Sequence, residues 1–369
     1  MNKTIARHPF VIVVSALIVG ALIGVLVAMV RSGSASDSAD PSGGGAETTA
    51  PSPDASVTPD ASAGSASAPP TAGTIDCTVP STAVTTADEL TAALRAATPG
   101  AVITMAPGTY VGNFVATTSG SAEAPITLCG TPDSVLDGDD VENGYGFHLD
   151  GGQYWQLSGF TVTNSQKGVM ADTTVGSVID GLTVTHIGDE AVHLRKASTD
   201  NRVLGNTISD TGVRKPKFGE GIYIGTAESN WCDISDCEPD KSDRNEIAGN
   251  TISGTSAESV DLKEGSSDGI LRGNTFDGSA ITEADSWVDV KGNGYLIEGN
   301  TGTNSPLDGF QTHEILDGWG TDNTFQNNVA NLNAAGFGYS LTPERGNVVS
   351  CTNTAANAGE GVTNVDCVT

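Results

Sequence analysis

The sequence has 369 residues, a formal net charge of −28, 46 glycines and only 5 % aromatic residues. This acidity argues against a nucleic-acid partner, because neutralising phosphates needs a basic surface. The length allows one substantial domain besides two N-terminal segments.

The first segment, residues 1–31, is predicted to be a membrane anchor. Lys3 and Arg7 precede an apolar run over 10–30, and Arg31 ends it. A helix of this length spans a hydrocarbon core of about 30 Å. The positive charge before the run predicts that the rest of the chain lies outside the cell. We therefore expect a transmembrane helix that holds the protein at the cell surface, or a cleaved segment that leaves it secreted.

The second segment, residues 32–74, consists almost entirely of small and polar residues, with Val57 as its one larger aliphatic residue. It cannot bury enough apolar surface to offset the entropy of ordering, so we expect a disordered linker. Residues 75–369 then form the folded domain.

All six cysteines fall in this domain, and an even number outside the cell predicts disulfides. Proximity in the sequence favours Cys232–Cys237 and Cys351–Cys367, which leaves Cys77–Cys129, among fifteen possible pairings. Zinc is less favoured, because no CxxC pair or histidine cluster accompanies them.

The domain is predicted to open with a helix. Thr86 and Glu89 are spaced as a capping box, and Leu90, Ala93, Leu94 and Ala97 follow at helical spacing. We expect this helix to cover the first coil of a stacked fold.

A short motif then recurs: a small residue followed by alternating apolar and variable positions. Its copies begin at Gly146, Gly168, Ala191, Gly221, Ser259, Trp287, Gly309 and Gly336. A second motif of Gly-Asn-Thr type interleaves with it, beginning at Gly205, Gly249, Gly273, Gly299 and, as Asn-Asn-Val, at Asn327. The alternation predicts two short strands per repeat, with the asparagines stacked as a structural ladder. The fold class is therefore all-β, a single-stranded right-handed parallel β-helix.

In the first motif the variable side chains should face outward. Neighbouring rungs lie about 4.8 Å apart, so stacking them in register forms one patch. Its predicted members are His193, Arg195, Tyr223, Asp261, Lys263, Asp289, Lys291 and His313, with Glu190, Glu220, Glu258 and Asp308 directly before the motif. The insertions 211–220, 226–243 and 279–286 are expected to wall this patch, and Tyr223, Trp231 and Trp287 to stack on sugars. A charge ladder that only stabilises the strands is the alternative.

Two stretches carry a family resemblance. The first includes Pro99-Gly100, Ala106–Tyr110, Ala124–Thr127 and Leu136–Gly138, and the second is Glu258–Lys263 followed by Gly273–Phe276. They resemble the chondroitinase B and alginate lyase family of polysaccharide lyases, which are parallel β-helix proteins. The resemblance implies that Glu258 helps to bind calcium and that Lys263 is the base.

The sequence departs from that family at two positions. Lys291, followed by Gly292-Asn293, stands where the family has an arginine followed by His-Gly, and Ser256 replaces a second carboxylate. Asp308–Phe310 is also similar to pectate lyases of other β-helix families, so the substrate does not follow from the resemblance.

The predicted activity is β-elimination on an acidic, uronate-containing polysaccharide. Lys263 is the expected base, Lys291 or Arg195 the cation on the substrate carboxylate, and Glu258 with Glu220 the ligands of calcium. A base requires the pKa of Lys263 to fall from about 10.4, which nearby cations favour and Asp261 and Asp289 oppose. Contact with the substrate is predicted for His193, Tyr223, Asp261, Asp289, Trp287 and His313.

Three alternatives remain open. A glycoside hydrolase would use two carboxylates, and Asp261 and Asp289 are available. A uronate C5-epimerase would share the lyase site and reprotonate the carbanion. A non-catalytic glycan-binding module would show no turnover. The expected partners are an acidic polysaccharide and the membrane, and the expected state is a monomer.

Overall fold

The structure, a computed structural model, describes residues 75–342 and 344–369. The predicted anchor over 1–31 and the predicted linker over 32–74 lie outside these described residues. Within the part of the chain that is described, no helix combines the length and the hydropathy of a membrane span.

The domain is a right-handed parallel β-helix built from three parallel sheets, and each coil contributes one strand to each sheet. Sheet A contains β1 (Thr82–Val84), β2 (Val102–Met105), β5 (Ile126–Cys129), β8 (Trp155–Ser158), β11 (Val178–Asp180), β14 (Arg202–Leu204), β17 (Glu246–Ala248), β20 (Ile270–Arg272), β23 (Leu296–Glu298), β26 (Thr324–Gln326) and β29 (Val348–Val349). Sheet B contains β3 (Gly108–Val111), β6 (Ser134–Asp137), β9 (Thr161–Ser165), β12 (Thr183–Ile187), β15 (Thr207–Thr211), β18 (Thr251–Ser253), β21 (Thr275–Asp277), β24 (Thr301–Thr303), β27 (Val329–Ala334) and β30 (Thr354–Ala358). Sheet C contains β4 (Phe114–Ala116), β7 (Tyr145–Asp150), β10 (Lys167–Asp172), β13 (Val192–Arg195), β16 (Ile222–Ile224), β19 (Val260–Leu262), β22 (Val288–Val290), β25 (Phe310–His313), β28 (Phe337–Thr342) and β31 (Gly361–Thr363).

The expectation of two strands per repeat is wrong, because sheet A supplies a third. Its strands have only two to four residues and stand directly before the Gly-Asn steps. Those steps form the corner between sheets A and B, where Gly249 has φ +66° and Asn327 takes the same left-handed backbone at φ +56°.

The predicted asparagine ladder is confirmed at this corner. The ladder consists of Asn206, Asn250, Asn274, Asn300, Asn328 and Asn353. From Asn250 onward, the side-chain oxygen of each asparagine accepts the backbone N–H of the asparagine one rung earlier, at 2.9–3.0 Å. Each amide nitrogen donates to a buried carbonyl, as from Asn274 to Ile247 at 3.0 Å. The ladder thus pairs backbone groups that the turn would leave buried and unpaired.

The predicted cap is helix α1 (Ala87–Ala96), which lies at the N-terminal end of the stack. The Thr86 hydroxyl accepts the N–H of Glu89 at 3.2 Å, and the Glu89 carboxylate accepts the N–H of Thr85 at 2.7 Å. Leu90 and Leu94 are buried against the first coil. The capping box therefore forms, although its return bond reaches one residue before the N-cap.

The three disulfides Cys77–Cys129, Cys232–Cys237 and Cys351–Cys367 confirm the predicted pairing. The predicted register of sheet C is also confirmed from His193 through Tyr223 and Asp261 to Asp289. It is wrong by two residues at the last rung, where Tyr339 pairs with Phe310 and its ring stacks on Phe310 at 5.3 Å. As a result Thr342, and not Ser340, stands beside His313.

Candidate active site

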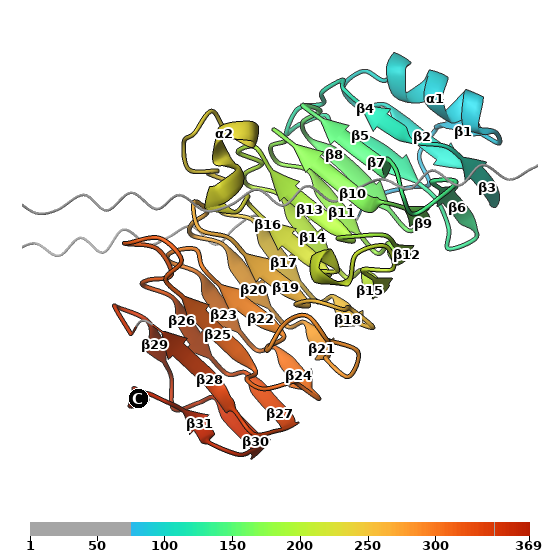
Figure 1. Ribbon diagram of the computed structural model, residues 1–369. Coiled ribbons are helices and arrows are strands. Elements are labelled where there is room, and N and C mark those ends of the chain that lie inside the picture. The colour runs from blue at the N-terminus through green and yellow to red at the C-terminus, as the bar shows by residue number, and fades with distance from the viewer. Residues whose placement is uncertain (1–74, 343) are drawn as a thin grey trace, which may run out of the picture. The chain divides into compact units, whose positions relative to one another are not determined.

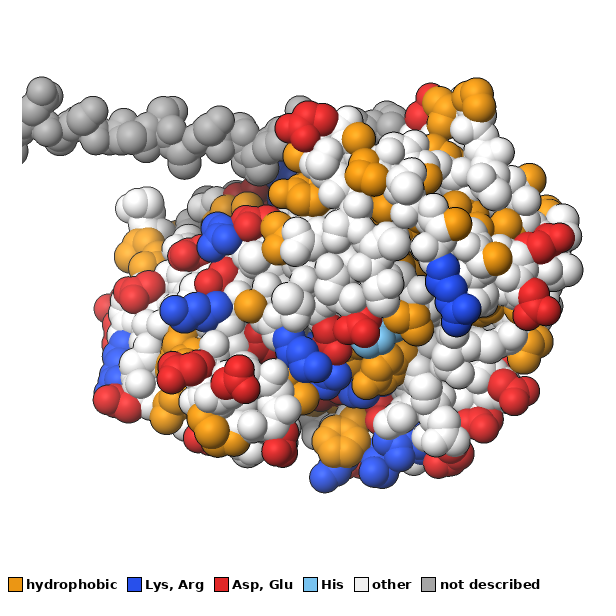
Figure 2. Space-filling view, turned by 90° about the horizontal axis from the view of Figure 1, so that it is seen from above, with side chains coloured by type: hydrophobic (Ala, Val, Ile, Leu, Met, Phe, Trp, Pro, Cys, Tyr) orange, Lys and Arg blue, Asp and Glu red, His pale blue; other side chains and the backbone are white. Residues whose placement is uncertain are grey.

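A cavity of about 590 Å³ lies on the outer face of sheet C. Its floor includes His193, Arg195, Tyr223 and Lys263, which come from β13, β16 and the end of β19. Figure 2 shows basic, acidic and hydrophobic side chains gathered around a histidine on one face of the molecule.

Two of the three predicted insertions wall this cavity. The loop 212–220, with the short helix η1 (Pro216–Phe218), lines one side. The insertion 226–243, with η2 (Glu228–Asn230) and α2 (Trp231–Ile234), lines the other. The segment 279–286 contributes no residue to the cavity, contrary to expectation. Its Glu283 lines a smaller neighbouring groove instead.

The floor groups His193, Tyr223 and Lys263. The His193 and Tyr223 rings are 4.4 Å apart between centroids, and Lys263 Nζ lies 5.0 Å from the centre of the Tyr223 ring. His193 Nε2 lies 2.9 Å from the Gly225 carbonyl, which can only accept, so this nitrogen carries the proton. Burial, with Lys167 and Arg195 nearby, holds the pKa of His193 well below its usual value. The imidazole is therefore neutral, and its Nδ1 has no hydrogen-bond partner.

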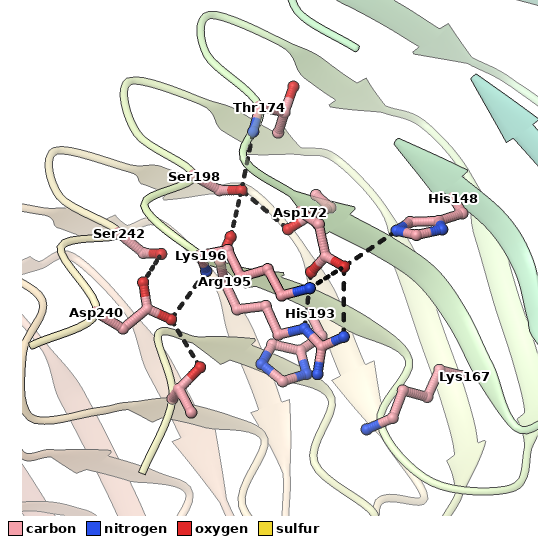
Figure 3. A network of polar contacts seen from close by, with 12 residues as sticks. His148, Lys167, Asp172, Thr174, His193, Arg195, Lys196, Ser198, Asp240 and Ser242 are labelled. Carbon is pink, nitrogen blue, oxygen red and sulfur yellow. Dashed lines mark hydrogen bonds and ion pairs between the residues drawn. The ribbon is translucent and has the colours of Figure 1, made fainter. Parts of the chain in front are cut away.

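Asp172 holds Arg195, as Figure 3 shows, and Arg195 lines the cavity. Its Nε donates to Asp172 Oδ1 at 2.7 Å, while His148 and Lys196 reach the other carboxylate oxygen at 3.2 and 3.4 Å. Burial alone would raise the pKa of Asp172, but the hydrogen bonds from His148 and Arg195 lower it below its usual value. A second guanidinium nitrogen of Arg195 donates to the same carboxylate at 3.3 Å, so Arg195 is a fixed cation at the cavity floor.

On the next rungs, Asp261, Lys291, Asp289 and His313 form a continuous series of ion pairs. Lys291 Nζ lies 2.8 Å from Asp261 and 2.7 Å from Asp289, and Asp289 accepts from His313 Nδ1 at 2.8 Å. Lys291 is 7 % exposed, and none of Asp289, Lys291 and His313 lines the cavity. The structure therefore does not bring Lys291, one of the two predicted cations for the substrate carboxylate, into the cavity, and it pairs Lys291 with two buried aspartates. At these rungs the alternative of a structural charge ladder holds.

Three carboxylates lie together beside the floor. Oxygens of Glu220, Glu258 and Asp261 all fall within 4.8 Å of one another. Glu220 Oε2 is buried without a hydrogen-bond partner, and burial with the neighbouring carboxylates raises the pKa of Glu220 well above its usual value. Burial and Asp261 likewise raise the pKa of Glu258 to about 7. Clustered carboxylate oxygens, one of them unpaired, suit a hard divalent cation. The predicted ligands Glu220 and Glu258 are therefore brought together, with Asp261 as an unpredicted third.

The pKa of Lys263 is raised, contrary to what a base requires. Burial lowers it, but Asp261 Oδ2 at 2.6 Å outweighs burial, and Glu258 and Glu220 add to the effect. The same carboxylates act on Tyr223, whose pKa is raised well above its usual value by burial, then by Asp261 and Glu220.

The predicted tryptophan platforms are wrong. Trp287 is 0 % exposed and packs edge-on against Phe310 in the core, with its indole N–H donating to the Thr303 carbonyl at 3.0 Å. Trp231 is buried and its indole N–H donates to the Thr226 carbonyl at 2.8 Å. Of the predicted aromatic residues only Tyr223 lines the cavity.

Lys167 and Phe218 are among the lining residues that the predicted site did not include. Lys167 stands directly before its motif, in the same column as Glu190 and Glu220, so its position was readable in the sequence. Phe218 lies in an irregular loop, where no repeat fixes its direction. Lys217 of the same loop also lines the cavity; the sequence offers the basic residues of this loop either as contacts for an anionic chain or as solvated charge.

Comparisons with known proteins agree with this architecture. A family model described as the Pel9A-like right-handed β-helix region matches residues 74–217. The alginate lyase from Paenibacillus sp. str. FPU-7 is 34 % identical with a TM-score of 0.73, over 78 % of this chain and 99 % of that one. No curated protein matches the chain.

Two further solved structures are similar in fold alone. Pectate lyase Pel9A is 16 % identical with a TM-score of 0.51, over 74 % of this chain and 72 % of that one. The endo-xylogalacturonan hydrolase from Aspergillus tubingensis is 13 % identical with a TM-score of 0.50, over 76 % and 92 %.

Proposed function

We propose that this chain, which belongs to one family with the alginate lyase from Paenibacillus sp. str. FPU-7, is a lyase that cleaves a uronate-containing polysaccharide by β-elimination. The observation that carries the proposal is the shared cavity of Lys263, Tyr223 and Arg195, which combines two groups able to transfer protons with one fixed cation. We infer that the domain acts outside the cell, at its surface or secreted.

The reaction sets three tasks. The C5 proton must be removed, the neighbouring carboxylate must be stabilised as charge develops on C5, and the 4-oxygen must leave. Arg195 would bind the carboxylate, since Asp172 fixes its orientation. Lys263 would take the C5 proton and the Tyr223 hydroxyl would protonate the leaving oxygen. His193 would hold the Tyr223 ring in place through their edge contact.

Glu220, Glu258 and Asp261 would hold calcium. These carboxylates are also the groups that raise the pKa values of Lys263 and Tyr223. A bound cation would supply positive charge that offsets them and favours the neutral form of Lys263.

The hydrolase alternative has less support. Asp261 is 1 % exposed and Asp289 is 6 % exposed, and Lys291 binds both. Carboxylates engaged in this way are poorly placed to act as acid and nucleophile on a sugar.

The test is the ultraviolet absorbance of the unsaturated uronide product. The purified protein is incubated with alginate, pectate, chondroitin and dermatan sulfate, each with calcium or with a chelator. We expect product from at least one polymer, faster with calcium. Lys263→Ala and Tyr223→Phe should each lower kcat by about 10²- to 10⁴-fold.

The matched control is Lys241→Ala, an exposed lysine outside this cavity, which should keep full activity. A folded protein that gives no product on any polymer would contradict the lyase. Inverted uronates without chain scission would instead indicate an epimerase, and polymer binding without turnover a glycan-binding module.

A further inference from the structure

The loop 212–220 carries a second groove that leads away from the cavity. This groove has a volume of about 260 Å³ and is lined by Arg214, Lys215, Pro216, Lys217 and Glu283. Arg214 and Lys217 also line the large cavity, so the two spaces adjoin. A chain lying in the cavity could therefore continue over a surface rich in positive charge.

The loop is firmly held. The Ser256 hydroxyl donates to the Pro216 carbonyl at 2.7 Å, and the Thr211 hydroxyl donates to the Gly219 carbonyl. Arg214 Nε donates to Asp189 at 3.1 Å, which uses the charge of Arg214 to anchor the loop. Ser256, which stands where the resembling family has a carboxylate, thus serves here to fix the loop.

The remaining cations of the loop lack acidic partners. Among the described residues no carboxylate pairs with Lys215 or Lys217, whereas Arg195, Arg214, Lys263 and Lys291 are all paired. Their Nζ atoms lie 5.7 and 4.6 Å from the centre of the Phe218 ring, which is 37 % exposed. An exposed aromatic face beside unpaired ammonium groups suits an acidic sugar, because the ring packs on the apolar face and the ammonium binds the carboxylate.

We propose that Lys215, Lys217 and Phe218 form a binding subsite for an acidic sugar unit away from the bond that is cleaved, so that the protein prefers long acidic chains to short ones. This inference rests on the proposed lyase activity and specifies the length of acidic chain that the lyase prefers. The subsite contributes to binding and leaves the chemical step unchanged, since none of the three side chains belongs to the Lys263–Tyr223–Arg195 group.

The test uses two variants: a double variant that carries both Lys215→Ala and Lys217→Ala, and the single variant Phe218→Ala. The kinetic constants of each are measured on a cleaved polymer and on the shortest oligomer that is cleaved. Each should raise KM for the polymer by about tenfold, the loss expected for one charge-assisted contact or one ring contact, with kcat unchanged. KM for the oligomer should change less than twofold. Lys215→Arg with Lys217→Arg should restore polymer binding, since charge is kept.

The matched control is Arg95→Ala with Lys241→Ala, which removes the same charge from exposed positions outside both grooves and should leave KM unchanged. Equal effects on polymer and oligomer, or no effect on either, would overturn the subsite. Thermal unfolding checks that each variant is folded.

A binding measurement separates this inference from the proposed activity. In the Lys263→Ala background, the dissociation constant of the polymer is measured by calorimetry with and without the loop substitutions. Weaker polymer binding supports the subsite even if no polymer is cleaved by the unaltered protein. An unchanged constant, or no binding of any acidic polymer, overturns it.

Discussion

Lys263 and Lys291 occupy the same column of sheet C on adjacent rungs, yet they have different surroundings. Lys263 lines the cavity and pairs with Asp261 at 2.6 Å. Lys291 is enclosed by Asp261 and Asp289 and has no access to the cavity. The insertion 226–243 lines the cavity together with Lys263 and does not reach Lys291, so two adjacent rungs of one column differ in their access to the cavity.

Trp287 stands at the start of its repeat, where the other rungs have glycine, alanine or serine. Its ring fills the space that Gly302 leaves in sheet B, where the neighbouring rungs have Phe276 and Ala330. A Cβ on Gly302 would lie 2.4 Å from the indole ring. The large side chain of Trp287 and the missing side chain of Gly302 thus compensate each other in volume at this coil.

We predict that Trp287→Ala lowers the free energy of unfolding by about 3–5 kcal/mol, because it empties a large buried volume. Adding Gly302→Ile should recover part of this loss by refilling the space. Urea unfolding measures both. An unchanged unfolding midpoint with a raised KM would instead mean that Trp287 contacts the substrate.

His313 provides a pH-dependent contact. Its hydrogen bond to Asp289 raises the pKa of His313 above its usual value. A raised pKa means that the ion pair stabilises the fold below the unfolded pKa of about 6.5 and is lost as the pH rises through the folded value.

His313→Gln should therefore cost up to about 1 kcal/mol at pH near 5.5, a modest amount because the side chain is partly exposed. The difference in the free energy of unfolding between His313→Gln and the unaltered protein should be smaller at a pH near 9. Urea midpoints at the two pH values measure it, and an equal difference at both would contradict the charge contribution.

The short strands of sheet A depend on the asparagine ladder at their ends. Asn274 donates its amide to the Ile247 carbonyl and to Asn300, and its oxygen receives the N–H of Asn250. All three ladder members are buried. The ladder therefore fixes the corner of several coils at once.

Asn274→Ala should lower the free energy of unfolding by about 1–3 kcal/mol for each buried group left unpaired. Asn331→Ala, a half-buried residue of β27 outside the ladder, is the comparison and should cost much less. Similar losses for both variants in denaturant unfolding would show that the ladder adds no special stability.

The charge of the whole molecule opposes its proposed substrate. The chain has a net charge of −28, and the cavity itself is lined by both acidic and basic side chains. Lys215 and Lys217 in the adjoining groove have no carboxylate partner among the described residues. We therefore expect a polyanion to be repelled at long range and to be attracted locally by Lys215 and Lys217.

Added salt should first lower KM, because long-range repulsion is screened once the Debye length falls to about 10 Å near 0.1 M. At higher salt KM should rise again as the direct contacts of lysines with carboxylates weaken. Kinetics over a range of sodium chloride concentrations test this. A KM that only rises with salt would show that local attraction dominates throughout.

The sequence alone determined the coil repeat, the capping helix and most of the register of sheet C, because each depends on local spacing and on period-two alternation. Proximity in the sequence also favoured the Cys232–Cys237 and Cys351–Cys367 disulfides, whereas Cys77–Cys129, which spans 52 residues, was only the pair that remained. The sequence also shows that a large residue at Trp287 is matched by a small one at Gly302, which a comparison of adjacent repeats reveals.

Only the tertiary structure decided which rungs form the site. Residues of the insertions form the walls of a cavity over β13 and β16. Lys263 and Tyr223 line this cavity, and Lys291 lies outside it. The direction of the Lys263 pKa shift was likewise open, since burial and the nearby carboxylates oppose each other. Both outcomes depend on distances between residues remote in sequence, and local patterns do not encode such distances.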